Sequence, residues 1–161
     1  MPMNGTVILL CGKIASGKSY YAQQLRESQK AVLLSSDELM LTLFEGKEGQ
    51  HHDMLAERAH RYLLQLAAEL AYGGCDVILD WGFWTAESRR TVRQFFAQKE
   101  IPTQLHYMDI SPAVWQQRIR QRNALVEQGK VQAYFVDDGL LEKLNSRFDP
   151  PAPEEVDRYI R

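Results

Sequence analysis

The sequence feature that most constrains the fold of this chain is the stretch Gly12-Lys13-Ile14-Ala15-Ser16-Gly17-Lys18-Ser19. It matches the pattern G-x-x-x-x-G-K-[ST], a glycine-rich loop between a strand and a helix that cradles phosphate groups. An apolar run at residues 6–11 precedes the stretch, and a helical pattern at residues 20–27 follows it. The sequence therefore predicts a nucleotide-binding loop in its usual strand–loop–helix setting.

The chemistry of this loop follows from its backbone. Glycines let successive N–H groups turn toward phosphate oxygens, and the N-terminus of the following helix adds a partial positive charge. Lys18 is expected to reach the β- and γ-phosphates, and Ser19 to ligate Mg²⁺. ATP and Mg²⁺ are therefore the expected cofactors. The residues expected to bind the nucleotide are Gly12, Lys13, Ile14, Ala15, Ser16, Gly17, Lys18, Ser19 and Tyr20.

Strand and helix patterns alternate along the whole chain. Strands are expected at residues 6–11, 31–35, 76–80 and 103–109, with a short fifth at 156–160; further helices are expected at 54–72, 85–98, 111–127 and 137–148. The first three strand runs are almost continuously apolar, as in parallel strands covered on both faces. The pattern predicts a three-layer α/β fold of the P-loop NTPase type, with a mostly parallel sheet of about five strands and helices on both faces.

Length and composition set the limits of this fold. The 161 residues are expected to form one domain, residues 1–161, with a small lid at approximately 118–135. Hydrophobic residues make up 45% and the formal net charge is −2, which disfavours a basic nucleic-acid surface spread over the domain. Cys11 and Cys75 are expected to be buried thiols. The sequence shows no leader peptide and no run long enough to cross a membrane, so a cytoplasmic location is expected.

Two acidic residues follow predicted strands at the edge where ligands of parallel sheets bind. Asp37 is a candidate general base that accepts the proton of an acceptor hydroxyl. The alternative is that Asp37 only caps the next helix, together with Ser35 or Ser36. Asp80 is a candidate ligand of Mg²⁺, with acceptor contact or strand-end capping as alternatives.

Two arginines in the predicted helix at 111–127 are candidates for phosphate contacts. Arg118 and Arg122 lie four residues apart and share a helix face, so they can close over a triphosphate and balance its charge. The alternative is a solvated basic face. Two further arginines, Arg89 and Arg90, are either exposed helix charges or acceptor contacts.

Aromatic residues gather after the third predicted strand. Trp81 and Trp84, with Phe83 between them, are candidate contacts to the acceptor, and packing under the following helix is the alternative.

The histidines carry weaker signals. The run His51-His52-Asp53 has metal-binding residue types, but adjacent side chains in a glycine-containing loop rarely form a metal site. His60 and His106 are expected to be an ordinary helix residue and an ordinary strand residue.

The order of these motifs resembles that of the small P-loop kinases, a group that includes the 5′-kinase domain of phage polynucleotide kinase, the zeta-toxin kinases and chloramphenicol phosphotransferase. The resemblance covers about residues 6–151 and implies that Asp37 is the catalytic base and that the arginines of a lid helix contact ATP. Met40 stands where polynucleotide kinases carry an arginine that holds the acceptor phosphate. The segments that carry the resemblance are Gly12–Ser19, Ser35-Ser36-Asp37, Val77–Asp80 with Glu87–Arg90, Asp109–Arg118 with Arg122-Asn123, and Phe148–Pro151.

These observations together predict a phosphotransferase that moves the γ-phosphoryl group of ATP to a hydroxyl of a small-molecule or nucleoside-like acceptor. The expected catalytic residues are Lys18, Asp37, Arg118 and Arg122, and Asp37, Asp80, Trp81 and Trp84 are expected to meet the acceptor. A polynucleotide or nucleotide 5′-hydroxyl kinase and a non-catalytic or slowly hydrolysing ATP-binding regulator stay open as alternatives. A nucleic-acid partner is not favoured, no membrane partner is expected, and the oligomeric state is left open.

Overall fold

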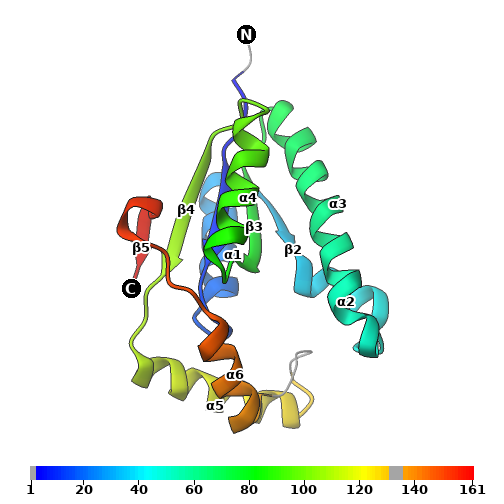
Figure 1. Ribbon diagram of the computed structural model, residues 1–161, viewed down its shortest axis with the longest axis vertical. Coiled ribbons are helices and arrows are strands. Elements are labelled where there is room, and N and C mark those ends of the chain that lie inside the picture. Colours follow the sequence, from blue (N-terminus) through cyan, green and yellow to red (C-terminus); the bar gives the residue numbers. More distant parts are fainter. Residues whose placement is uncertain (1–2, 131–135) are drawn as a thin grey trace.

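The computed structural model describes residues 3–130 and 136–161 and contains a five-stranded parallel sheet (Figure 1). The strands are β1 (Val7–Cys11), β2 (Val32–Ser35), β3 (Val77–Gly82), β4 (Thr103–Met108) and β5 (Arg158–Ile160). Their order across the sheet is β2-β3-β1-β4-β5. The expected short C-terminal strand is present, and it pairs with β4 at the register His106↔Arg158. The predicted parallel α/β sheet is thus confirmed.

Capping residues fix where most helices begin. The side-chain oxygens of Ser35, Thr85, Ser111 and Asp137 each accept a hydrogen bond from a backbone N–H in the first turn that follows, which satisfies a donor with no partner inside the helix. The helices are α1 (Lys18–Gln29), α2 (Ser36–Phe44), α3 (His52–Tyr72), α4 (Ala86–Ala97), α5 (Pro112–Glu127) and α6 (Asp138–Arg147), with 3₁₀ turns η1 (Gly49–His51) and η2 (Pro153–Glu155).

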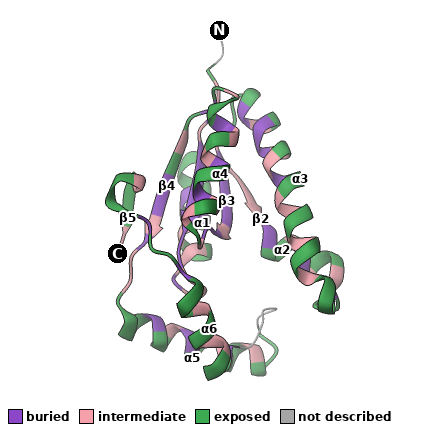
Figure 2. Ribbon diagram, in the orientation of Figure 1, coloured by how far each residue is buried: buried purple, intermediate pink, exposed green. Residues whose placement is uncertain are grey.

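The alternation of side chains along the buried strands produces the layers. Val7 and Leu9 of β1 pack in one cluster with residues of α3 and α4, whereas Ile8 and Leu10 pack on the opposite face against α1. Figure 2 shows the buried strands between these helical layers. Because both faces of the central strand are apolar, the sheet is covered on both sides, as the continuous apolar runs predicted.

Helices α5 and α6 lie beyond the carboxyl ends of the strands, and α2 lies near the same end of the sheet beside α3 (Figure 1). Trp115 and Ile119 of α5 form a small apolar cluster with Val136. Ile14 of the glycine-rich loop packs against this cluster. The loop is therefore enclosed between the sheet and the α5–α6 pair.

Strand β3 differs from its predicted form. It continues past Asp80 to Gly82, and the pairing with β1 shifts by one residue between Leu79 and Gly82. Such a bulge re-aims the side chains beside it. Gly82 and Phe83 then both adopt positive φ, 85° and 48°, so the chain turns sharply after the bulge.

Two smaller expectations also need correction. Cys75 is exposed, whereas Cys11 is buried as expected, because Cys75 precedes β3 rather than lying inside it. Helix α3, expected to begin at residue 54, begins at His52, directly after η1. Among the residues that the structure describes, no helix has the length and apolar character needed to cross a membrane.

A buried histidine links α1 to the sheet and makes a pH-dependent prediction. The hydroxyl of Tyr21 lies 2.7 Å from Nδ1 of His106, and Nε2 of His106 lies 3.0 Å from Oε1 of Gln104. A neutral imidazole with its proton on Nε2 satisfies both contacts. Burial lowers the pKa of His106 from 6.5 to about 4.

We predict that this histidine makes the fold less stable in mild acid. Between pH 6.5 and about pH 4 the unfolded chain takes up a proton at His106 that the folded chain does not, so the free energy of unfolding falls as the pH drops through this window, by up to about 3 kcal/mol. Urea denaturation from pH 7 to pH 4.5 measures the fall. His106→Gln should flatten it, and His51→Gln, at an exposed site, should not. An unchanged pH profile in His106→Gln would contradict the assignment.

Candidate active site

The backbone of the glycine-rich loop is shaped by close contacts that only glycine allows. A Cβ on Gly12 would lie 2.7 Å from Oγ of Ser16, and a Cβ on Gly17 would lie 2.9 Å from Nη1 of Arg118. Gly17 also has a φ of 99° at the N-cap of α1, a conformation that other residues rarely adopt. The backbone N–H of Gly12 donates to the carbonyl of Gly82 at 3.0 Å, which ties the loop to the end of β3.

The loop has polar groups that fit a bound phosphate. Oγ of Ser16 is buried and has no hydrogen-bond partner among the described residues, a costly arrangement unless a ligand or water supplies the partner. The glycine-permitted cradle and the N-terminus of α1 form the setting in which backbone N–H groups bind phosphate. The residues present therefore fit a nucleoside triphosphate.

Lys18 lies at the centre of this site. Its Nζ donates to the carbonyl oxygen of Lys13 at 2.9 Å, within the loop itself. Burial lowers the pKa of Lys18, and the negative charges of Asp80 and Asp37 oppose that shift. The ammonium thus lies close to two carboxylates and to the phosphate cradle. An anionic ligand bound there would offset the free-energy cost of burying the positive charge.

Ser19 and Asp80 form a pair of oxygen donors beside Lys18. The hydroxyl of Ser19 lies 3.5 Å from Oδ2 of Asp80, and Asp80 is only 7% exposed. Burial raises the pKa of Asp80, while Lys18 lowers it. Protein sites for Mg²⁺ beside nucleotides use one or two such oxygens and complete the shell with phosphates and water, so this donor set fits the ion.

The run His51-His52-Asp53 lies at the start of α3. Across residues 3–130 and 136–161, no three His, Cys, Asp or Glu side chains come together as metal ligands. His52 instead begins α3, and its Nδ1 lies 2.9 Å from Oε1 of Glu48.

Asp37 lies in the first turn of α2 and does not cap it. Oγ of Ser35 accepts the hydrogen bond from the N–H of Glu38 at 3.2 Å, so the capping alternative for Asp37 is wrong. Asp37 lines a cavity together with Lys18. Its negative charge raises the pKa values of Lys18, His60 and Arg122 against the effect of burial. The carboxylate is therefore placed among three basic groups at the mouth of the phosphate loop.

The two predicted arginines of α5 both turn toward the phosphate loop and its surroundings. Nη1 of Arg118 donates to the carbonyl of Ser16 at 2.7 Å. Nη1 of Arg122 is buried without a hydrogen-bond partner among the described residues. Burial lowers the pKa of Arg122, and the charge of Asp37 opposes the shift. These side chains thus do not form a solvated face, in contrast to the exposed Arg120. Of the predicted lid at 118–135, the part at 131–135 lies outside the described residues.

Sequence reasoning missed two residues that support the loop, Trp115 and Asn145. The indole Nε1 of Trp115 donates to the carbonyl of Ile14 at 2.7 Å, and Nζ of Lys13 donates to Oδ1 of Asn145 at 2.7 Å. The same Nζ lies 4.4 Å from the centre of the Trp115 ring. The side chain of Tyr20, predicted to contact nucleotide, is 72% exposed. Trp115 precedes Arg118 by three residues, and this helical spacing is the signal that could have placed it on the loop-facing side.

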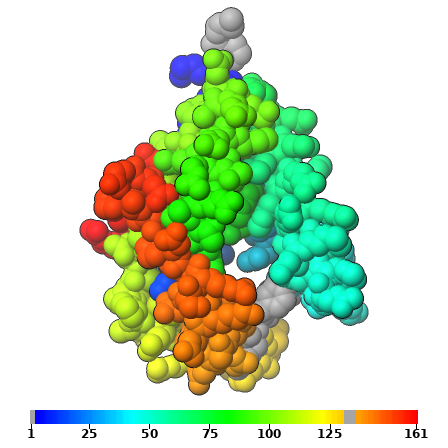
Figure 3. Space-filling model, viewed as in Figure 1, coloured from blue at the N-terminus to red at the C-terminus, as the bar shows by residue number. Residues whose placement is uncertain are grey.

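A cavity of about 480 Å³ opens beside the phosphate loop. Figure 3 shows the surface hollowed between α6 and the α2–α3 region. Trp81 and Trp84 line it, and His60 of α3 stacks on Trp81 with ring centres 4.7 Å apart. His60 was expected to be an ordinary helix residue, and only the packing of α3 on β3 reveals its place. The full described lining is Ile14, Lys18, Asp37, His52, His60, Trp81, Gly82, Phe83, Trp84, Thr85, Ser88 and Leu144.

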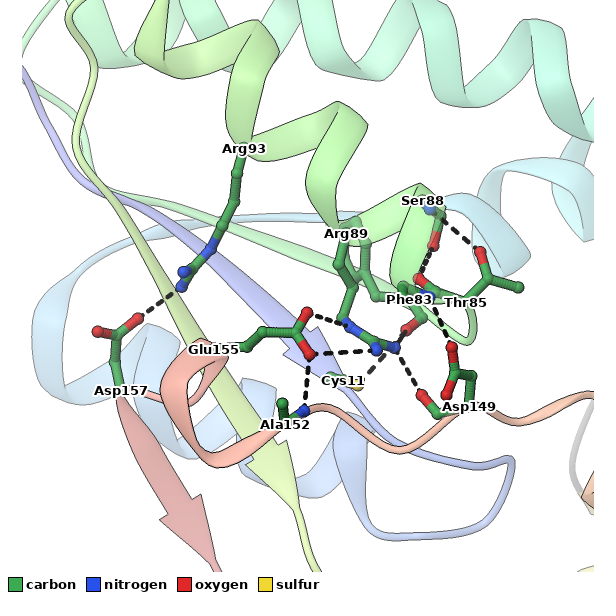
Figure 4. A network of polar contacts seen from close by, with 11 residues as sticks. Cys11, Phe83, Thr85, Ser88, Arg89, Arg93, Asp149, Ala152, Glu155 and Asp157 are labelled. Carbon is green, nitrogen blue, oxygen red and sulfur yellow. Dashed lines mark hydrogen bonds and ion pairs between the residues drawn. The ribbon is translucent and has the colours of Figure 1, made fainter.

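Arg89 supports the turn after β3, which forms one wall of this cavity. It is neither an exposed helix charge nor a residue of the described cavity lining, so neither predicted role is correct. The side chain is 1% exposed, and its Nη1 donates to the carbonyls of Phe83 at 2.9 Å and Asp149 at 2.8 Å. Its Nε donates to Glu155 at 2.9 Å. Figure 4 shows the guanidinium at the centre of this network. Arg89 thus joins the turn after β3 to the C-terminal segment, whereas Arg90 is exposed.

We predict that Arg89→Met destabilises the fold by about 3 kcal/mol, since it leaves the partly buried carboxylate of Glu155 and two carbonyls without their donor. The matched control is Arg90→Met on the same helix, which should change the free energy of unfolding by less than about 0.5 kcal/mol because the side chain is exposed. Urea denaturation at pH 7 measures both. Equal, small effects of the two substitutions would show that the network in Figure 4 does not stabilise the fold.

Comparisons with known proteins agree with this architecture. The sequence profile of AAA_33, described as an AAA domain, matches residues 7–151. A candidate kinase from Chloroflexus aurantiacus J-10-fl has a similar structure, with a TM-score of 0.76, 21% identity and coverage of 98% of this chain and 87% of the other.

Two further solved structures share the fold. The APS kinase CysC of Mycobacterium tuberculosis, in complex with AMPPNP and APS, has a TM-score of 0.69, 21% identity and coverage of 99% and 89%. A gluconokinase from Sinorhizobium meliloti 1021 has a TM-score of 0.63, 16% identity and coverage of 99% and 82%. No curated protein sequence matches this chain. At these identities the structural likeness establishes the fold.

Proposed function

The chain belongs to the AAA_33 family of AAA domains, and from this membership and the geometry of its site we propose that it transfers the γ-phosphoryl group of ATP to a hydroxyl of a small-molecule acceptor. The observation that carries the proposal is the position of Lys18, which lies close to the carboxylates of Asp37 and Asp80 and, with Asp37, lines a cavity that adjoins the phosphate loop. Phosphoryl transfer needs a phosphate cradle, a metal site and a carboxylate beside the acceptor. The kinase structures that share this fold support the proposal.

The phosphate loop and α5 handle the triphosphate in this proposal. Backbone N–H groups of residues 12–19 bind its oxygens, and Lys18 leaves the carbonyl of Lys13 to contact the β- and γ-phosphates. Arg118 and Arg122 approach from α5 and balance the negative charge. Ser19 and Asp80 would hold Mg²⁺, which when bound neutralises charge on the β- and γ-phosphates.

Asp37 handles the acceptor. Its carboxylate accepts the proton of the acceptor hydroxyl while that oxygen bonds to the γ-phosphorus and the bond to the β–γ bridging oxygen breaks. The products are ADP and a phosphate ester. The position of Asp37 at the start of α2, uncommitted to capping, supports this role.

Two alternatives predict different behaviour. A polynucleotide 5′-kinase would prefer 5′-hydroxyl oligonucleotides and lose affinity steeply with salt. Met40, which takes the place of the arginine in polynucleotide kinases, is 3% exposed and offers no charge to an acceptor phosphate, so the small-molecule reading is favoured. A regulator would bind ATP without acceptor-stimulated turnover.

The test is ADP formation from MgATP in the presence of hydroxyl acceptors: nucleosides, 5′-hydroxyl oligonucleotides, sugars and amino alcohols. One acceptor class should stimulate turnover strongly. Asp37→Asn should cut that turnover by about 100-fold or more, the scale of a general base, and leave ATP affinity unchanged. The neighbouring Glu38→Gln removes an exposed acid of the same turn and should retain most activity.

Two results would contradict this assignment. Full turnover in Asp37→Asn would show that Asp37 is not the base. Tight ATP binding with no acceptor-stimulated turnover across the panel would favour the regulator.

A further inference from the structure

We propose that the acceptor of this site is an uncharged alcohol with a flat, apolar ring, and that it carries no phosphate, sulfate or carboxylate group. This inference rests on the proposed function and assigns the cavity of about 480 Å³ to the acceptor. The volume suits a small-molecule ligand, since such pockets typically measure about 300–1,000 Å³.

The walls of the cavity favour a flat, apolar ligand. Trp81 and Phe83 have ring centres 5.2 Å apart, and His60 stacks on Trp81 at an angle of 17°. Trp84 adds a fourth ring and meets Phe148 edge-on. Each of these rings is fixed by another ring, so the wall is rigid before a ligand binds, which reduces the entropy lost on binding. Ring-bearing ligands bury apolar area against such walls and gain favourable aromatic contacts.

The cavity lacks the cations that an anionic acceptor needs. Lys18 is the sole Lys or Arg in its described lining, and the proposed reaction engages Lys18 with the triphosphate. Residues 131–135 contain no Lys, Arg or His, so their sequence adds no basic side chain. Phosphate and carboxylate recognition ordinarily depends on a bidentate Arg or a Lys, and the described lining has none to spare.

The two histidines of the lining do not replace those cations. Burial lowers the pKa of His60, which keeps its imidazole largely neutral at pH 7. His52 lies 2.9 Å from the carboxylate of Glu48, so any positive charge that it carries is already matched.

The carboxylate of Asp37 in the cavity wall also opposes an anionic acceptor. Asp37 is the one Asp or Glu in the described lining, and in the proposed reaction the neighbouring Lys18 and Arg122 face the triphosphate. An anion beside Asp37 would be repelled by its carboxylate, whereas an uncharged hydroxyl can donate to Asp37 without that cost.

The experiment compares matched ligand pairs in the presence of saturating MgADP, which occupies the nucleotide site. The pairs are thymidine with thymidine 3′-monophosphate, and 2-phenylethanol with 4-(2-hydroxyethyl)benzoate. Affinity is read from tryptophan fluorescence, and phosphate transfer from ATP is measured separately. The uncharged member of each pair should bind at least about tenfold more tightly, a difference of about 1.4 kcal/mol.

A charge introduced at the cavity tests the electrostatic argument directly. Ser88 of α4 lines the cavity. Ser88→Lys should reduce the ratio of affinities between the uncharged and the anionic member of each pair at least about fivefold, because the added ammonium attracts the anionic member. Thr91→Lys adds the same charge to an exposed position of the same helix and should leave the preference unchanged.

The outcomes separate this inference from the proposed function. Equal or tighter binding of the anionic members overturns the inference, as does the absence of binding by both uncharged ligands at about 1 mM, the upper end of ordinary substrate affinities. Phosphate transfer to the anionic members alone would support the proposed phosphotransferase activity and overturn the inference about the acceptor. Preferred binding of uncharged members without any transfer would support the acceptor class and overturn the proposed function.

Discussion

The shape of the phosphate loop depends on hydrogen bonds that its own backbone cannot supply. A loop that turns its N–H groups inward toward an anion turns carbonyls outward, and buried carbonyls need donors. The indole of Trp115 and the guanidinium of Arg118 donate to the carbonyls of Ile14 and Ser16. Helix α5 therefore both supports the cradle and delivers positive charge to it, which explains why a helix beyond the sheet edge lies so close to the nucleotide site.

A second constraint joins the acceptor side of the site to the C-terminal segment. The bulge in β3 and the positive φ angles of Gly82 and Phe83 form a turn that would be weakly held by local contacts alone. Arg89 bonds the carbonyl of Phe83, the carbonyl of Asp149 and the carboxylate of Glu155 together (Figure 4). The segment that leads into β5 thus completes the sheet and also stabilises the aromatic wall of the cavity.

Much of this architecture could be predicted from local sequence, because strands, caps and the phosphate loop depend on residues close together in the chain. Ser111, Pro112 and Thr85 mark their helix ends for this reason. The stack of His60 on Trp81 and the burial of Arg89 depend on partners far away in sequence, and a single sequence carries no signal for such pairs. The role of Asp37 as base rests on its place after a predicted strand and on the resemblance, and it stays a prediction; the structure adds that Ser35 rather than Asp37 caps α2.

The most direct test of the account is the affinity for ATP in the presence of Mg²⁺, measured by titration calorimetry on the wild type, Lys18→Ala and Lys13→Ala. Lys18 lies among the carboxylates of the site, whereas the side chain of Lys13 turns away to Asn145. The account predicts one saturable site whose affinity falls at least about tenfold in Lys18→Ala and far less in Lys13→Ala. Absence of ATP binding by the wild type, or equal losses in both variants, would contradict it.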